Sequence, residues 1–275
     1  MSKISILKFE IRDRTTSQPR KALPMNLRPL LLCFALAAAA LLVRADEPKT
    51  DLPAPDADGF ISLFNGKDLS GWDGLEGFWS VKDGAISGEE SKEHAAPQTD
   101  LNLAASVANP DKFSNFELHF SWKFTTPDGN SGVQFRSKIT DEKTKHSGGY
   151  QADFDGKQGY DGSIYDESGV AGGRATMSNR GEKTTWTAET KRQATPLSET
   201  KDELKKAIKV NDWNDAVVVA NGNHITYTVN GHLMTDLTDE SPKARSDGVI
   251  GIQLHHGFVM EIQIKDIKIK FLDGK

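Results

Sequence analysis

The sequence predicts an all-β protein, a two-sheet antiparallel β-sandwich with a minor short helix. Apolar and polar residues alternate with a period of two in most segments after residue 59. Glycine, asparagine and aspartate separate these segments at short intervals, and long helical periodicity is absent from them. The sequence has no repeat of fixed period, so a single sandwich is favoured over a propeller or a solenoid.

The N-terminal part of the chain has the composition of an export signal followed by a linker. Residues 30–43 (LLLCFALAAAALLV) form an apolar run that is shorter than the ~20 residues of a membrane span. We expect residues 1–24 to be an over-extended gene start and residues 25–45 a signal peptide cleaved near Ala45. The mature protein would then be periplasmic or extracellular, without stable membrane insertion. An uncleaved membrane anchor is the alternative.

Residues 46–58 (DEPKTDLPAPDAD) are rich in proline and acid, which predicts a flexible tether before a domain at 59–275. The only cysteine, Cys33, lies in the expected signal peptide, so a mature protein would have no disulfide bond. The net charge of -5 is spread along the chain, and the absence of a basic stripe argues against nucleic acid as a partner. The sequence does not indicate an oligomeric state.

The clearest strand is FELHFSWKF at residues 116–124, whose aromatic and leucine side chains share one face. Further strands are predicted in NSGVQFRSK, YQADF, AVVVANGNHITYTVNGHLM, GVIGIQLHH and VMEIQIKDIKIKF. Asn221-Gly222 and Asn230-Gly231 are tight-turn signals between consecutive strands. In the last segment the isoleucines change phase near Lys265-Asp266, which indicates a bulge. ETKDELKKAIK favours the short helix, and residues 182–200 are expected to be an irregular flap or decoration.

Six polar side chains alternate with apolar ones in three of these strands, so they are expected to share the outer side of one curved sheet. They are Gln134, Arg136, Gln151, Asp153, Gln253 and His255. Amide and guanidinium groups can pair with adjacent sugar hydroxyls, so this surface suits a carbohydrate. The glycine-rich stretch 156–162 would form the rim of the groove, with Tyr160, Tyr165 and Trp186 as candidate stacking platforms.

Seven motifs, in order, resemble the domain family once called DUF1080 and now described as 3-keto-disaccharide hydrolase. They are GFISLFNGKDLSGWDG with FWSVKDGAISGE, FELHFSWKF, GNSGVQFR, GGYQADF, GSIYDESG, WNDAVVVANGNHITYTVNG and GVIGIQLHHG, and the similarity spans residues 59–273. The resemblance implies a concanavalin A-like jelly roll that acts on sugars whose 3-hydroxyl is oxidised to a ketone. Cleavage would then proceed by loss of the C2 proton, an enolate at O3, and addition of water at C1.

That chemistry needs a base, a proton donor and stabilisation of the enolate. Asp153 and Glu167 are candidate bases or acids, and Arg136 and His255 are candidate enolate stabilisers. The candidate substrate-binding residues are Gln134, Gln151, Tyr165, Asp166 and Gln253. No metal ligand is assigned, although a divalent ion, calcium or a transition metal, could share the stabilisation.

Simpler interpretations stay open for several of these residues. Asp155 and Asp161 favour turn formation, with a calcium site as the alternative, and Arg136 could pair with Asp153 across the sheet. For the whole domain the alternatives to an enzyme are a non-catalytic carbohydrate-binding module of lectin-like fold and a structural envelope protein.

Overall fold

The computed structural model describes residues 50–273. The expected gene start, signal peptide and cleavage site lie outside these residues and stay predictions. Residues 50–58 form no helix or strand, and the Asp56 carboxylate accepts hydrogen bonds from the backbone N–H groups of Asp58 and Phe60. Within the described range, no helix is both long enough and apolar enough to span a bilayer.

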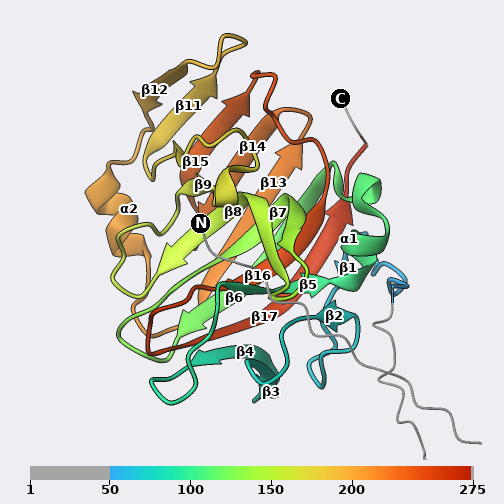
Figure 1. Cartoon of the computed structure of the whole chain (residues 1–275). Helices are drawn as coiled ribbons and strands as arrows, with labels where there is room; N and C mark the ends of the chain where they lie inside the picture. Colours follow the sequence, from blue (N-terminus) through green and yellow to red (C-terminus); the bar gives the residue numbers. More distant parts are fainter. Residues whose placement is uncertain (1–49, 274–275) are drawn as a thin grey trace, which may run out of the picture. The chain divides into compact units, whose positions relative to one another are not determined.

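Two sheets form the domain, and Figure 1 shows β7, β8 and β16 of one sheet lying across β6, β13 and β17 of the other. The larger sheet has the order β12 (Arg192–Pro196), β11 (Glu182–Trp186), β15 (His232–Asp239), β14 (His224–Val229), β13 (Asn214–Asn221), β6 (Phe116–Phe124), β17 (Met260–Phe271), β4 (Ala85–Glu90) and β3 (Trp79–Lys82), with β1 (Ile61–Ser62) beside β17. The smaller sheet has the order β10 (Thr176–Ser178), β9 (Ile164–Asp166), β8 (His146–Asp155), β7 (Asn130–Asp141), β16 (Val249–Leu254), β5 (Thr99–Leu103) and β2 (Trp72–Asp73). All pairings are antiparallel except that of β11 with β15.

The core lies between the sheets because the apolar face of each strand turns inward. Phe116, Leu118 and Phe120 of β6 are almost fully buried. Trp122 of β6 stacks on Phe154 of β8, with ring centroids 4.7 Å apart, so the two sheets meet directly through aromatic side chains. The predicted all-β, two-sheet antiparallel sandwich of jelly-roll type is confirmed.

Helical structure is short, as the sequence predicts. Within residues 50–273 its four pieces are α1 (Ala104–Ala108), η1 (Pro110–Phe113), η2 (Glu167–Gly169) and α2 (Lys201–Ala207). The predicted helix corresponds to α2, where the Thr200 side chain accepts from the backbone N–H of Glu203 and the Glu203 carboxylate accepts from that of Thr200. Leu204 anchors this helix in the core.

The predicted tight turn and the predicted bulge are also confirmed. Asn230 and Gly231 adopt positive φ values of 51° and 84° between β14 and β15, the backbone that a tight Asn-Gly turn requires. The register of β17 against β6 shifts between Lys265 and Lys268, and Asp266 has a φ of 53° there. The irregular conformation expected for 182–200 is wrong, because this segment contains the paired strands β11 and β12, which extend the larger sheet at its edge.

Candidate functional site

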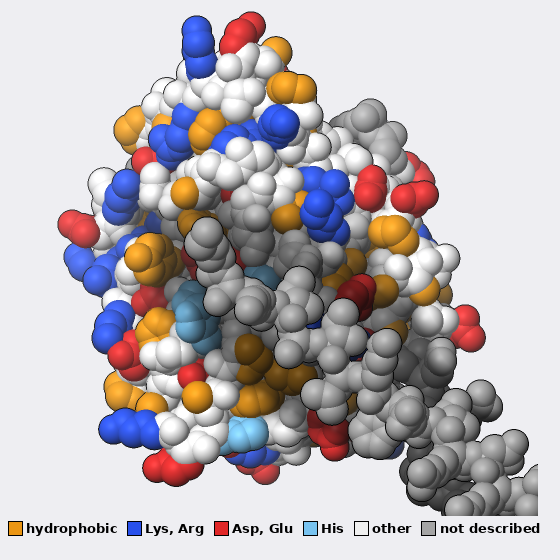
Figure 2. All heavy atoms as spheres, viewed as in Figure 1, with side chains coloured by type: hydrophobic (Ala, Val, Ile, Leu, Met, Phe, Trp, Pro, Cys, Tyr) orange, Lys and Arg blue, Asp and Glu red, His pale blue; other side chains and the backbone are white. Residues whose placement is uncertain are grey.

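A cavity of about 630 Å³ lies on the outer side of the smaller sheet, where β8 and β9 meet η2 and the loop after β16. Its lining includes Gln151, Asp153, Tyr160, Tyr165, Glu167 and His255. On the face turned to the viewer in Figure 2, histidine side chains lie beside hydrophobic ones. The cavity therefore combines carboxyl, amide, imidazole and aromatic groups.

Strand register brings the polar floor of this cavity together. Tyr165 of β9 lies opposite Gln151 of β8, which lies opposite Gln134 of β7, and opposed residues point to the same side of a sheet. The Gln134 amide donates to Oε1 of Gln151 at 2.5 Å, and Nε2 of Gln151 donates to Oδ1 of Asp153 at 3.0 Å. Gln253 of β16 joins the group, with its Oε1 3.4 Å from the same Nε2.

A glycine makes this arrangement possible. Gly132 of β7 lies opposite Asp153 of β8. A Cβ atom on Gly132 would come within 2.4 Å of the Cγ atom of Gln151, far inside van der Waals contact. The side chain of Gln151 therefore lies over Gly132, which leaves its amide in reach of Gln134 and Asp153.

The predicted polar residues are more buried than expected. Gln134 and Gln253 have no exposed surface, and Gln151 and Asp153 are 2% and 5% exposed. The expectation of an open groove that bears all of them is therefore wrong. They form the buried floor of a cavity instead, and only Gln151 and Asp153 among these four line it.

The placement expected for Arg136 is also wrong. Arg136 has a φ of 47° in an irregular part of β7, where pairing with β8 shifts between Phe135 and Lys138. This irregularity breaks the period-two alternation on which the expectation rested. Its guanidinium donates to the backbone carbonyls of Ser114, Gly222 and Arg245 and is almost fully buried. Arg136 neither lines the cavity nor pairs with Asp153.

Two residues that the sequence reading did not single out, Asp100 of β5 and His146 of β8, lie directly behind the cavity wall. Nδ1 of His146 lies 2.8 Å from Oδ2 of Asp100, and Nε2 lies 2.7 Å from Oγ of Ser168. Nε2 is also 3.5 Å from Oε1 of Glu167. The imidazole thus connects a fully buried carboxylate to a carboxylate that lines the cavity.

The charges in this network are mutually stabilising. Burial opposes the charged form of His146, but the hydrogen bonds and charges of Asp100 and Glu167 outweigh it and raise its pKa to about 9. Burial raises the pKa of Asp100, against the hydrogen bonds from His146 and Ser147. Because three donor groups converge on Oδ2 of Asp100, we take Asp100 and His146 as an ion pair at neutral pH.

The two carboxyl groups of the cavity differ in protonation. Burial opposes ionisation of Glu167, but the hydrogen bond and charge of His146 outweigh it, so its pKa lies below the usual value. Burial raises the pKa of Asp153 well above its usual range, and the hydrogen bond from Gln151 opposes this only in part. Glu167 is therefore the more readily ionised of the two and the better candidate base, while Asp153 is the more readily protonated and the better candidate hydrogen-bond donor.

Three of the predicted aspartates stabilise the loops beside the cavity through hydrogen bonds to backbone N–H groups. Asp166 accepts from the backbone N–H groups of Ala171 and Arg174, so it shapes the loop beside the cavity. The turn interpretation holds for Asp155, which accepts from three backbone N–H groups of its own loop, and for Asp161, which accepts from that of Asp155.

Trp186 is not a stacking platform for a ligand. It is 9% exposed, its Nε1 donates to the carbonyl of Met177, and the guanidinium of Arg174 lies 4.9 Å from its ring centroid. Arg174 is in turn held by a buried ion pair with Asp239. Both side chains therefore support the fold at this end of the larger sheet.

Within residues 50–273, no group of three or more histidine, cysteine, aspartate or glutamate side chains is arranged to hold a metal ion. Asp155 and Asp161 belong to no such group, and their carboxylates accept hydrogen bonds from backbone N–H groups. The involvement of a divalent ion stays untested.

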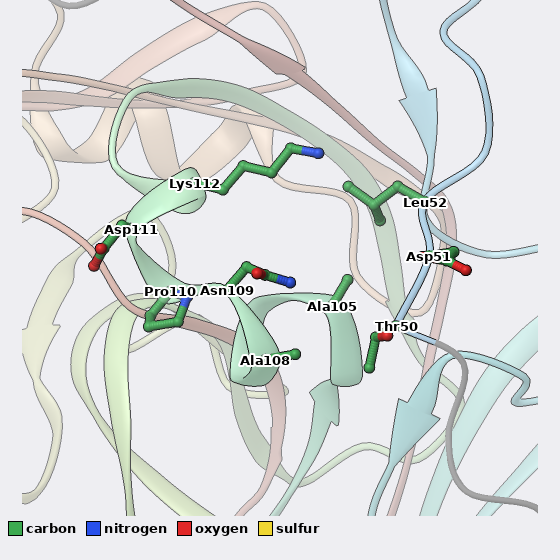
Figure 3. A pocket seen from close by; sticks show the side chains of 9 residues that line it. All are labelled: Thr50, Asp51, Leu52, Ala105, Ala108, Asn109, Pro110, Asp111 and Lys112. Atoms are coloured by element: carbon green, nitrogen blue, oxygen red, sulfur yellow. The ribbon is translucent and has the colours of Figure 1, made fainter.

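A second hollow, of about 470 Å³, lies between α1, η1 and residues 50–52 (Figure 3). Its charged side chains are Asp51, Asp111 and Lys112, and Figure 3 shows the carboxylate of Asp111 pointing away from Lys112. Among the described residues that line this hollow, none is a histidine or an aromatic residue, so we place the candidate site in the other cavity.

The two-sheet antiparallel sandwich, with its cavity on the outer side of the smaller sheet, places the chain in the class of jelly-roll β-sandwich proteins. The protein-family model of the 3-keto-alpha-glucoside-1,2-lyase-like domain matches residues 59–270 of the sequence. The chain therefore belongs to this family. This confirms the family resemblance inferred from the sequence motifs.

Individual relatives are more distant. A 3-keto-disaccharide hydrolase of Bacteroides thetaiotaomicron is 32% identical over 116 residues, which cover 40% of this chain and only 38% of that protein. A candidate glycosyl hydrolase from Parabacteroides distasonis is 21% identical, with a TM-score of 0.46 over 79% of this chain and 95% of its own. Carbohydrate-binding module CBM66 from Bacillus subtilis is 16% identical, with a TM-score of 0.46 over 73% and 95%.

Proposed function

We propose that this protein cleaves the glycosidic bond of glycosides whose sugar carries a ketone at C3, such as 3-keto-disaccharides. One observation carries the proposal within the family: Glu167 and Asp153 line the same cavity, and their surroundings shift their pKa values in opposite directions. A pair of this kind supplies a base and an acid at one pH.

In the proposed reaction Glu167 takes the proton from C2, which the neighbouring ketone makes acidic. The electron pair moves into an enolate at O3, and the bond from C1 to the leaving oxygen then breaks by elimination. The leaving oxygen gains a proton, and a double bond between C1 and C2 remains beside the restored ketone. The hydroxyl of a water molecule then adds at C1, and C2 regains a proton to give the free 3-keto sugar. Each acid or base step of this type contributes ~100- to 10,000-fold to the rate.

The neutral carboxyl group of Asp153 is assigned to the enolate, because a buried acid that keeps its proton can donate a hydrogen bond to a developing oxyanion. Gln151 holds Asp153 in place through the hydrogen bond to Oδ1. His255 lies in the more exposed part of the cavity lining and is the candidate donor to the leaving oxygen.

Asp100 and His146 are positioning residues in this scheme. The imidazolium of His146 lies 3.5 Å from Oε1 of Glu167, so it keeps that carboxylate ionised. Its hydrogen bond to Ser168 also holds η2, the turn that carries Glu167. Asp100 fixes the imidazole from the buried side.

The test is incubation of the protein with a 3-keto-disaccharide in D₂O, with NMR detection of the released sugar and of deuterium at C2. The matched unoxidised disaccharide and a protein-free sample are the controls, because 3-keto sugars exchange protons slowly by themselves. We expect release and C2 exchange only with protein and the oxidised substrate. Binding without release or exchange would refute the reaction and favour a carbohydrate-binding module.

We also propose that the protein is exported, on the basis of the apolar run and the residues before Ala45. Sequencing of the N-terminus of protein purified from the producing cells tests this. A mature chain that begins near Asp46 is expected, and a chain that retains residues 25–45 would contradict signal cleavage.

A further inference from the structure

An exposed tyrosine marks the rim of the cavity. Tyr160 is 57% exposed and is the one aromatic residue among the exposed large hydrophobic side chains of the described region. It also lines the cavity, which the other exposed hydrophobic side chains do not. Its ring is thus available to a ligand that already occupies the polar floor.

Several hydrogen bonds brace the loop that carries Tyr160. The Asp155 carboxylate accepts from the backbone N–H groups of Lys157, Gly159 and Tyr160, at 2.7, 3.1 and 2.5 Å. Arg180 adds a hydrogen bond from its guanidinium to the carbonyl of Asp161 on the same loop. An aromatic side chain on a fixed loop loses little conformational entropy when a ligand stacks on it.

A second aromatic group reaches the cavity from the loop between β16 and β17. Phe258 and His255 both line the cavity and contact each other edge to face, with ring centroids 5.5 Å apart. The rim is therefore built by rings from two loops, whereas Gln151, Asp153 and Glu167 provide the polar groups of the same cavity.

The charge of the lining restricts what the rim can bind. Among the described residues that line the cavity, none is a lysine or an arginine. Glu167 is ionised and its charge is compensated from behind by His146, and the lining histidine, His255, is assigned to the leaving oxygen, so no lysine or arginine is available to a ligand carboxylate or phosphate. An uncharged aromatic ring can pack against the aromatic side chains of the rim and needs no cation in the cavity lining.

We propose that Tyr160, Phe258 and His255 form a subsite for an uncharged aromatic aglycone, so that the preferred substrates are aryl glycosides of neutral sugars. The assignment of the sugar to the polar floor rests on the proposed function. Glycosides of uronic acids and sugar phosphates are disfavoured, because their anionic group would lie beside the Glu167 carboxylate in a lining without lysine or arginine.

The test measures binding, so that it does not require turnover. The 3-keto derivatives of phenyl glucoside, methyl glucoside and phenyl glucuronide are titrated calorimetrically into Asp153→Asn protein, which is expected to lose most turnover and retains the Glu167 carboxylate. The same titrations use that protein with Tyr160→Ala, with Tyr160→Phe, or with Val107→Ala, a control at a 41%-exposed site on α1.

The phenyl glucoside is expected to bind more tightly than the methyl glucoside and the phenyl glucuronide. Tyr160→Ala should weaken phenyl glucoside binding by about 3- to 10-fold, and Tyr160→Phe and Val107→Ala should retain the preference. Equal binding of phenyl and methyl glucosides, no measurable binding of the phenyl glucoside, or unchanged affinity in Tyr160→Ala would overturn the subsite. Equally tight binding of the glucuronide would overturn the charge restriction. If the phenyl glucoside binds more tightly but the native protein does not cleave it, only the proposed reaction is refuted and the aromatic subsite stands.

Discussion

Nδ1 of His146 lies 2.8 Å from Oδ2 of Asp100, in a pair whose carboxylate has no solvent exposure. The two residues come from β8 and β5, which lie on opposite sides of β7 and β16 in the smaller sheet. His146 also lies 3.5 Å from Oε1 of Glu167, so the contacts run from a buried carboxylate on β5, through the imidazole on β8, to a carboxylate on η2 that lines the cavity.

Asp100→Asn is expected to lower the pKa of His146 from about 9 toward its ordinary value. A folded-state pKa above the unfolded value stabilises the protein fully below about pH 6.5, and this stabilisation is lost as pH rises through about 9. Imidazole NMR titration measures the pKa, and urea unfolding at pH 6 and pH 9 measures the stability. The variant should show a smaller drop between the two pH values. An unchanged His146 titration would contradict the pairing.

Asp153→Asn is expected to abolish most turnover while it reduces the pH dependence of stability. The pKa of Asp153 is raised in the folded state, so its contribution to stability is present at low pH and is lost as pH rises toward the raised pKa. Asparagine carries no such charge, so the variant should lose less stability between pH 4 and pH 8. Thermal unfolding at several pH values and aglycone release are the measurements. Full turnover in the variant would remove Asp153 from the mechanism.

Glu167→Gln is expected to reduce kcat by ~100- to 10,000-fold, because the amide cannot accept the C2 proton. Glu189→Gln is the matched control, since Glu189 is exposed on the turn between β11 and β12 and does not line the cavity. Loss of deuterium exchange at C2 in the first variant alone would assign the base. Normal exchange in Glu167→Gln would transfer that role to another group.

Gly132→Ala is expected to destabilise the fold and to lower activity, because the new Cβ would lie 2.4 Å from the Cγ atom of Gln151. The side chain of Gln151 would have to move, and its hydrogen bonds to Gln134 and Asp153 would be lost. The double variant Gly132→Ala/Gln151→Ala removes the clash and should regain part of the thermal stability but not the activity. Additive losses in the double variant would show that the two positions are not coupled.

Arg136→Met is expected to lower the free energy of unfolding by about 3 kcal/mol or more, because it leaves buried carbonyl oxygens without donors. Those acceptors are the backbone carbonyls of Ser114, Gly222 and Arg245. Urea unfolding measures the loss, and turnover of the folded fraction at low temperature is expected to persist. Normal stability with lost turnover would return Arg136 to the reaction.

The sequence was sufficient for most of the fold. The alternation in 116–124 assigned each side of β6, and the core confirms it from Phe116 to Phe124. Asn230-Gly231 and the change of phase near Asp266 predicted a turn and a bulge. These features depend on local backbone geometry and on which side of a strand is apolar, and neighbouring residues determine both.

The period-two alternation that predicted the fold was less successful for the site. Alternation correctly grouped Gln134, Gln151 and Asp153, but it failed at Arg136, where an irregular pairing with β8 redirects the side chain. It also gave no reason to select His146, which falls on the same parity as the core residue Tyr150.

The sequence by itself determined the strands, their apolar faces, the tight turns and the family to which the chain belongs. Only the tertiary structure decided that the polar faces are buried beneath a cavity and that Asp100 meets His146, 46 positions away. The physical reason is that ionisation depends on burial and on charges in contact. Long-range strand pairing creates those contacts, and a period-two pattern contains no information about which strands will be neighbours.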